Sequence, residues 1–123
     1  FVYPAFKVVK INEDYPSQGQ TDVLAQGDFV PDTHEVKGRA LLIEQNGEKT
    51  IRFEGFETIN GPDLRIYLSA DSDAQDFIDL GKIKATSGNV NYDIPEGTDL
   101  KKYNKVLVWC RAFRVGFSHA ELS

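Results

Sequence analysis

The chain has 123 residues, of which 41% are hydrophobic and 27% are charged, and its formal net charge at pH 7 is −5. A chain of this length can bury one core without disulfides or a structural metal, and its composition is that of a folded domain and not of a disordered segment. The acidic balance argues against non-specific nucleic-acid binding, which needs clustered Lys and Arg. No apolar stretch approaches the ~20 residues of a membrane helix.

The first 22 residues differ in composition from the rest of the chain. Phe1–Phe6 is apolar and aromatic, so it is either the outer end of a membrane anchor or signal segment lost upstream, or an edge strand or packing arm. Residues 12–22 are polar and contain Pro and Gly, which is typical of a linker. We therefore expect an N-terminal arm and linker over residues 1–22 and a single β domain over 23–123.

From residue 23 onward, apolar runs of strand length alternate with turn residues. Several of these runs alternate apolar and polar residues with a period of two, as a strand with one buried face does. The pattern predicts strands over 23–30, 35–45, 49–56, 64–69, 79–85, 89–94, 105–113 and 115–122.

Two local signals predict how two of these strands are connected and where one of them is irregular. Asn46-Gly47 favours positive φ at two consecutive positions, which predicts a type I′ hairpin turn between the second and third runs. Gly55 interrupts the alternation of the third run, so that Phe56 falls out of register with Phe53. We expect a β-bulge at this glycine.

Helix signals are confined to two short segments. Ser72 and Gln75 have the spacing of a capping box, which predicts one helical turn, and residues 99–103 are expected to form another. About eight to nine short strands with short connections indicate an all-β domain. We expect an antiparallel β-sandwich or partly open barrel with one or two short helical turns.

Cys110 is the single cysteine, and it ends the most hydrophobic run of the chain, Val106–Cys110. An intramolecular disulfide and a four-cysteine zinc site are excluded because there is no second cysteine. Strand alternation places Cys110 on the same face as Val108 and turns Trp109 to the opposite face. The thiol is therefore a small core residue, a redox thiol or a metal ligand, and the pattern alone favours the core residue.

The two histidines, His34 and His119, are each expected at a loop or strand end. Together with Cys110 they form a Cys/His/His set, whose ligand softness suits Zn²⁺ or copper. The three residues lie far apart in sequence, so their spacing adds no support. A metal site that includes Cys110 and His34 is a secondary hypothesis beside two ordinary surface histidines.

The sequence carries no recognisable catalytic motif. There is no nucleophile elbow and no phosphate-binding glycine loop, and Ser118 and His119 would point to opposite faces of a strand. Asp63 follows Gly61-Pro62 in a turn, where we expect its side chain to accept bonds from nearby backbone N–H groups. The residues favour a non-enzymatic role, and a hydrolase is the option with the least support.

Five segments, taken in their order along the chain, resemble a known family. They are Gly27–Phe29 with His34 and Gly38, Asn60–Ser69, Leu80–Lys84 with Gly88 and Asn91–Pro95, Val108–Phe113, and Val115–Leu122. In this order the pattern over residues 23–122 resembles the electron-transfer DM-thirteen domain family, whose domain also occurs in Skeletor-type proteins.

The resemblance implies a β-sandwich-like, extracytoplasmic domain, often found behind a signal or membrane anchor or beside cytochrome-like DOMON domains. It implies a redox role centred on the cysteine that Cys110 matches, and His34 matches a position where histidine is frequent. Tyr67 and Trp109 would pass an electron only if both converge with the thiol. The resemblance leaves open the cofactor, whether a metal ion or a haem-like group, and the protein or redox partner.

Two functions from different classes follow. The first is a membrane-anchored, extracytoplasmic redox domain centred on Cys110, with supporting roles for His34, Asp63, Tyr67, Trp109 and His119. The second is a binding or adhesion module in which Cys110 is core structure and the loops or an edge strand contact a partner. The surroundings of the Cys110 sulfur distinguish the two.

Overall fold

The computed structural model describes residues 8–16 and 21–123, and within them the chain is all-β, as expected. The alternatives for Phe1–Phe6 concern residues outside these ranges. No helix of the described residues is long and apolar enough to cross a membrane. The strands are β1 Lys10–Asn12, β2 Thr21–Pro31, β3 Val36–Gln45, β4 Glu48–Thr58, β5 Leu64–Ser69, β6 Phe77–Lys82, β7 Ser87–Asp93, β8 Lys105–Cys110 and β9 Val115–Glu121.

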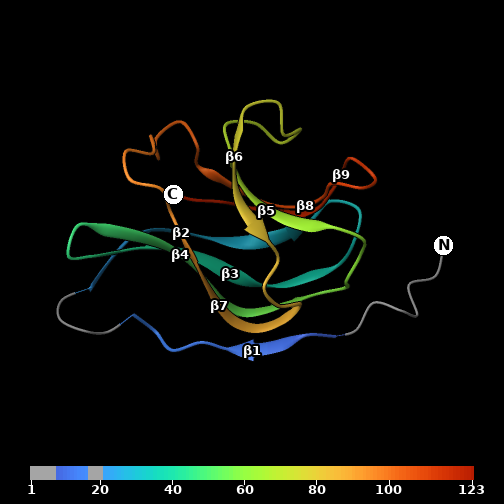
Figure 1. Ribbon diagram of the computed structural model, residues 1–123, viewed down its shortest axis with the longest axis horizontal. Coiled ribbons are helices and arrows are strands. Elements are labelled where there is room, and N and C mark those ends of the chain that lie inside the picture. The colour runs from blue at the N-terminus through green and yellow to red at the C-terminus, as the bar shows by residue number, and fades with distance from the viewer. Residues whose placement is uncertain (1–7, 17–20) are drawn as a thin grey trace.

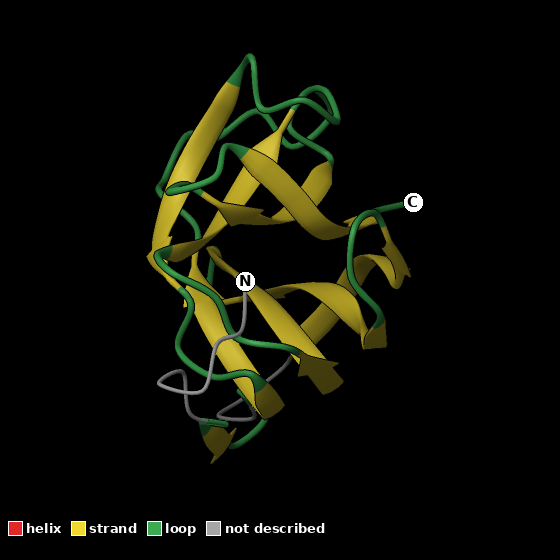
Figure 2. Cartoon of the chain, turned by 90° about the vertical axis from the view of Figure 1, so that its right-hand side faces the viewer, coloured by secondary structure: helices red, strands yellow, loops and turns green. Residues whose placement is uncertain are grey.

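The nine strands of the described residues belong to one curled sheet in the order β1-β7-β4-β3-β2-β9-β8-β5-β6. The expected antiparallel pairing holds for every adjacent pair except β1 and β7, which run parallel. β2 belongs to both halves of the sheet, because residues 21–28 pair with β3 and Phe29–Pro31 pair with β9. The sheet therefore folds over itself into a partly open barrel whose halves face each other (Figures 1 and 2).

Aromatic rings fill the space between the two halves. Phe29 of β2 packs edge-on against Phe53 of β4 with ring centroids 4.8 Å apart, and Phe56 lies 4.8 Å from Phe53. The bulge expected at Gly55 is confirmed, since the pairing of β4 with β7 shifts register between Phe53 and Phe56. The extra residue returns Phe56 to the core face, so both rings are buried.

The hairpin between β3 and β4 has the expected two-residue turn. Asn46 and Gly47 have φ angles of 54° and 80°, and Gln45 pairs with Glu48 across the turn. Positive φ at both central residues is the type I′ conformation, which matches the twist of the two strands.

The strand predicted over 105–113 is wrong beyond Cys110, where β8 ends. Residues 111–114 form a turn in which Arg114 has a φ of 54°, and Phe113 is 49% exposed. Ala112 and Phe113 are apolar residues that follow Arg111 within this turn, so the pattern did not mark the end of the strand. The bounds of β6 and β7 also differ, because these strands begin two residues earlier than predicted, at Phe77 and Ser87.

The first of the two expected helical turns does not form, and the second forms as a single turn. Before β6, the Asp71 carboxylate, and not Ser72, accepts three backbone N–H groups at 2.8–3.1 Å. Ala74 follows with a φ of 52°, which a helix cannot contain. The second segment closes one isolated turn, in which the carbonyl of Asp99 accepts the N–H of Tyr103 at 2.9 Å.

The segment that contains β1 is held on the sheet by Arg52 of β4. The Arg52 residue is 5% exposed, and its guanidinium donates to the Glu13 carbonyl at 3.1 Å and to Asn91 Oδ1 at 3.0 Å. It also pairs with the Glu54 carboxylate at 2.9 Å and lies 5.4 Å from the Tyr15 ring centroid. A buried cation requires such partners, so Arg52 connects the N-terminal segment to the barrel.

Strand ends and loops gather at one end of the barrel, on the right in Figure 1, which we call the Cys110 end. Because neighbouring strands run in opposite directions, β2, β4 and β8 finish there and β3, β5 and β9 begin there. Its loops are residues 31–36, 58–64 and 110–115. Segments that are far apart in sequence are thereby brought together around Cys110.

Replacement of Gly88 tests the contact between β1 and β7. Gly88 has a φ of 114°, and an added Cβ would overlap the carbonyl oxygen of Ile11. We expect Gly88→Ala to lower the free energy of unfolding by about 2–4 kcal/mol, from backbone strain and overlap together.

Gly81→Ala is the matched control, because Gly81 has a φ of 111° and no atom within 4 Å of an added Cβ. It should show only the backbone strain, about 1–2 kcal/mol. Urea unfolding measures both, and equal losses in the two variants would contradict the close packing of β1 on β7.

Candidate functional site

Cys110 ends β8 with its side chain turned into the core. The residue is 0% exposed and lies on the inner face with Val106 and Val108, as alternation predicts. Its Sγ is 3.2 Å from the carbonyl oxygen of Pro62, to which the thiol donates a hydrogen bond. The thiol therefore contacts a polar backbone atom as well as apolar side chains, and protein atoms exclude solvent from it.

The loop between β4 and β5, residues 59–63, covers the sulfur and is called the capping loop here. Gly61 rests on the ring of Phe117, because an added Cβ would lie 2.9 Å from Phe117 Cζ. Asp63 has a φ of 56°, and its carbonyl accepts the N–H of Arg111 at 3.1 Å. These contacts hold the carbonyl of Pro62 over the thiol.

The Asp63 carboxylate joins two strands through two arginines. Its Oδ1 accepts from Arg65 Nε of β5 at 2.9 Å, and its Oδ2 accepts from Arg111 Nε, just after β8, at 2.7 Å. The hydrogen bond from Arg65, with the one from Arg111, lowers the pKa of Asp63 from its ordinary value of 3.8. We expected backbone N–H partners for this carboxylate, but it accepts hydrogen bonds from the guanidinium groups of Arg65 and Arg111 instead.

Tyr67 and Trp109 come together on the outer face of the sheet. The two rings are nearly parallel with centroids 6.3 Å apart, and Tyr67 stacks on Phe77 of β6 at 4.0 Å. Burial, followed by the charge of Asp79, raises the pKa of Tyr67, so its hydroxyl stays protonated. The aromatic rings thus converge with each other, while Cys110 lies on the inner face of the same β8 strand.

The histidines take different roles at the same end. The His34 ring packs edge-on against Phe117 with centroids 4.1 Å apart. His119 Nδ1 lies 2.9 and 3.0 Å from the two carboxylate oxygens of Asp32. Within residues 8–16 and 21–123, no three His, Cys, Asp or Glu side chains converge to hold a metal ion.

Phe117 organises this end, although the sequence pattern did not single it out. The pairing of β8 with β9 shifts register here, and the Phe117 side chain is 0% exposed. Its carbonyl accepts the backbone N–H groups of Asp32, Thr33 and His34 at 3.0–3.2 Å. The turn between β2 and β3 is therefore anchored to the residue on which the capping loop rests.

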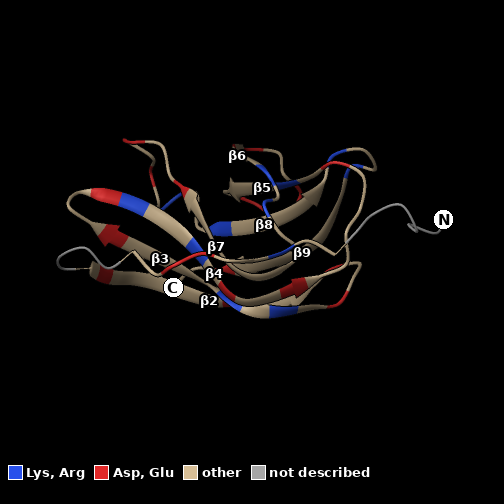
Figure 3. Cartoon of the chain, turned by 60° about the horizontal axis from the view of Figure 1, so that its bottom comes forward, with Lys and Arg blue, Asp and Glu red and all other residues tan. Residues whose placement is uncertain are grey.

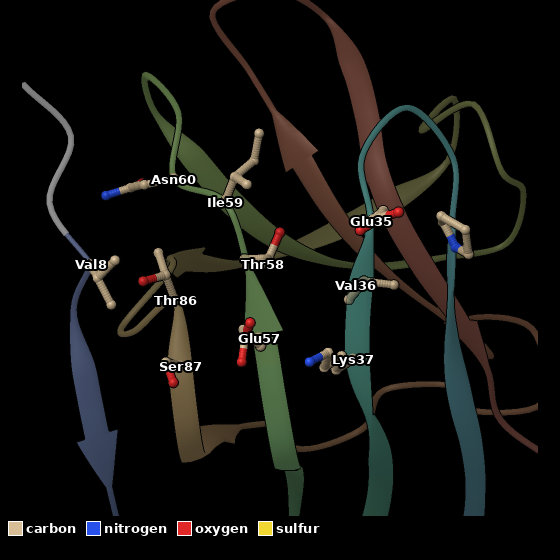
Figure 4. A pocket seen from close by; sticks show the side chains of 11 residues that line it. Val8, Glu35, Val36, Lys37, Glu57, Thr58, Ile59, Asn60, Thr86 and Ser87 are labelled. Atoms are coloured by element: carbon tan, nitrogen blue, oxygen red, sulfur yellow. The ribbon is translucent and has the colours of Figure 1, made fainter. Parts of the chain in front are cut away.

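A cavity of about 930 Å³ opens at the Cys110 end (Figure 4). Ile59 and Asn60 of the capping loop form part of its wall, and Thr58 of β4 and Val36 of β3 are among the other lining residues. The sequence pattern does not predict this cavity, because the described residues that line it come from five separate segments of the chain.

Charged residues are distributed over both halves of the sheet, with basic and acidic side chains interspersed (Figure 3). At the Cys110 site the two cations Arg65 and Arg111 are balanced by the two carboxylates of Asp63 and Asp79. The site therefore presents a neutralised cluster and not a single-sign field.

Comparison with known proteins adds one finding. The family model described as Electron transfer DM13 matches residues 28–122, which is most of the chain. No curated protein and no solved structure matches.

The pH dependence of stability tests the role of Asp63. A carboxyl with a lowered folded pKa stabilises the fold above its unfolded value near 3.8, and this contribution is lost as the pH falls through the folded value. We expect Asp63→Asn to be less stable at neutral pH and to lose less stability on acidification than the parent protein. Asp73→Asn, in an exposed loop, is the control, and thermal unfolding between neutral and acidic pH measures the difference. An acid response unchanged by Asp63→Asn would contradict the pairing.

Proposed function

The chain belongs to the family described as Electron transfer DM13, and from this premise we propose that it is an electron-transfer domain whose redox group is the Cys110 thiol. The observation that carries the proposal is the hydrogen bond from Cys110 Sγ to the Pro62 carbonyl. The capping loop holds this carbonyl in place, and Asp63 locks the loop to Arg65 and Arg111. The thiol thus has a polar partner at fixed geometry, which packing alone does not require.

Burial of the sulfur limits the chemistry that it can perform. Thiol–disulfide exchange needs a second sulfur to reach Sγ, and the capping loop stands in the way. Electron transfer needs no atomic contact. In the simplest balanced step, the thiol loses one electron and its proton to become a thiyl radical, and an external one-electron acceptor protein takes the electron. The proton is taken by a water molecule that enters under the capping loop as the thiol is oxidised, since water is small enough to pass where a second sulfur of a protein is not.

The outer aromatic rings provide a route from the thiol to the surface. Trp109 is the chain neighbour of Cys110, and its ring leads through Tyr67 to Phe77, which is 40% exposed. β8 separates the thiol from these rings, so a single strand divides the donor from the exit route. A partner that docks beside Phe77 would meet the end of this route.

Pulse radiolysis with the azide radical tests the proposal, because this oxidant generates an indolyl radical on the single tryptophan, Trp109. In the parent protein we expect Cys110 to reduce that radical, so that it decays several-fold faster than in Cys110→Ala. Phe113→Leu changes an exposed aromatic of the neighbouring turn and should leave the rate unaltered. Identical decay in the parent protein and Cys110→Ala would exclude Cys110 as the donor.

A binding or adhesion module is the second candidate, and the complete burial of Cys110 against Val106 and Val108 favours it. In this case Cys110 is core structure, and Cys110→Ala lowers the free energy of unfolding by only about 1 kcal/mol. The indolyl radical then decays alike with and without the thiol, so the same experiment separates the two functions.

We also propose that the domain is extracytoplasmic and tethered to a membrane by a segment upstream of this chain. The support is the family resemblance of residues 23–122 and the aromatic character of Phe1–Phe6. An impermeant amine-reactive label applied to intact cells should modify the domain. Labelling only after lysis would overturn this placement.

A further inference from the structure

The cavity at the Cys110 end has the size of a site for a small organic molecule. Its volume of about 930 Å³ lies within the usual range for ligand pockets, roughly 300–1,000 Å³. Pro31, Val36 and Ile59 supply apolar surface, and Thr58 and Asn60 supply polar groups. A mostly apolar wall with a few placed polar atoms is the usual composition of such a site.

Thr58 carries an unsatisfied hydroxyl at this cavity. The residue is only 8% exposed, and its Oγ1 has no hydrogen-bond partner among the described residues. Figure 4 shows the side chain among the lining residues at the end of β4. A buried hydroxyl without a partner is unfavourable, so a bound molecule with a hydrogen-bonding oxygen would relieve the cost.

Asn60 supplies a second polar side chain to the wall of the same space. Its Oδ1 accepts the N–H of Gly61 at 2.8 Å, which fixes the amide so that its nitrogen is the outer end of the side chain (Figure 4). The Thr58 hydroxyl can donate its hydrogen to a carbonyl oxygen. The polar part of the wall therefore suits a ligand with carbonyl acceptors.

The charges at the cavity select against an anion. Among the described residues, Glu35 and Glu57 line it together with a single lysine, Lys37, which faces Glu57 across the β3–β4 pair. Carboxylates thus outnumber the cation, and the cation has a carboxylate opposite. The described residues of the lining offer no aromatic ring on which a sugar would stack, so an apolar ring against their aliphatic side chains fits better than a carbohydrate.

We propose that this cavity binds an uncharged ring compound with carbonyl oxygens, of the quinone type, with the Thr58 hydroxyl as a hydrogen-bond donor. The capping loop contributes Ile59 and Asn60 to the cavity and Pro62 to the cover over Cys110. The choice of quinones among such rings rests on the proposed electron-transfer function, because they are carriers of electrons. The binding itself rests on the cavity alone.

Duroquinone is the probe, because its four methyl groups prevent addition of a thiol to the ring. We expect saturable chemical-shift changes in a ¹⁵N-labelled protein, centred on the amides of residues 58–61. Thr58→Val should weaken binding about tenfold, since it removes one hydrogen bond at constant shape. Thr58→Ser should retain it, and Thr98→Val, in a loop away from the Cys110 end, should not change it.

Durene, the same methylated ring without oxygens, provides a test that needs no variant. It should bind the parent protein as weakly as duroquinone binds Thr58→Val. Equal binding of durene and duroquinone, shifts centred elsewhere, or no saturation would overturn the proposal. Binding should persist in Cys110→Ala, so failure of Cys110 as an electron donor would leave this result standing.

Discussion

The Cys110 end depends on one residue, Phe117, which uses its ring and its carbonyl for different tasks. The carbonyl gathers three backbone N–H groups of the turn between β2 and β3. The ring supports Gly61 on one contact and the edge of His34 on another. A register shift in the pairing of β8 with β9 accompanies this placement. The cover over Cys110 and the turn beside it therefore share a single support, and neither is positioned independently.

The two sides of β8 have different chemistry because a strand turns successive side chains to opposite faces. Cys110 lies in a dry interior with a carbonyl as its polar neighbour, whereas Trp109 joins Tyr67 and Phe77 in a stack that reaches the surface. With the thiol on one side of the strand and the aromatic rings on the other, the thiol is protected from chemical attack but remains close enough to the rings for electron transfer. The same division is compatible with a purely structural cysteine, which is why the kinetic comparison, and not the geometry, separates the two functions.

Local signals in the sequence predicted those features that local geometry determines. Asn46-Gly47 specified its turn, Gly55 specified its bulge, and alternation assigned Cys110 and Trp109 to opposite faces. The end of β8 was missed because apolar residues continue into the turn up to Phe113. Hydrophobicity alone does not report where backbone pairing stops.

The candidate site was predicted in its residues but not in its contacts. Asp63 was recognised as a turn residue, yet its partners Arg65 and Arg111 depend on the register between β5 and β8, which no local pattern contains. The capping role of Pro62 required the same knowledge, and so did the cavity beside Thr58. The register between strands that are far apart in sequence is therefore what could not be predicted from the local pattern.

The parallel pairing of β1 with β7 determines at which end of the barrel the chain enters. β1 begins beside Ser87, so the chain enters the barrel at the Cys110 end, with Val8 on the wall of the cavity. A force applied to the chain before Val8, along the axis of β1, loads in shear all the residue pairs that β1 forms with β7, from Lys10 to Asn12, at the same time. The start of β1, the cavity and the cover over Cys110 thus lie at the same end of the barrel, so a force applied through the chain before Val8 acts at the end that carries the candidate site.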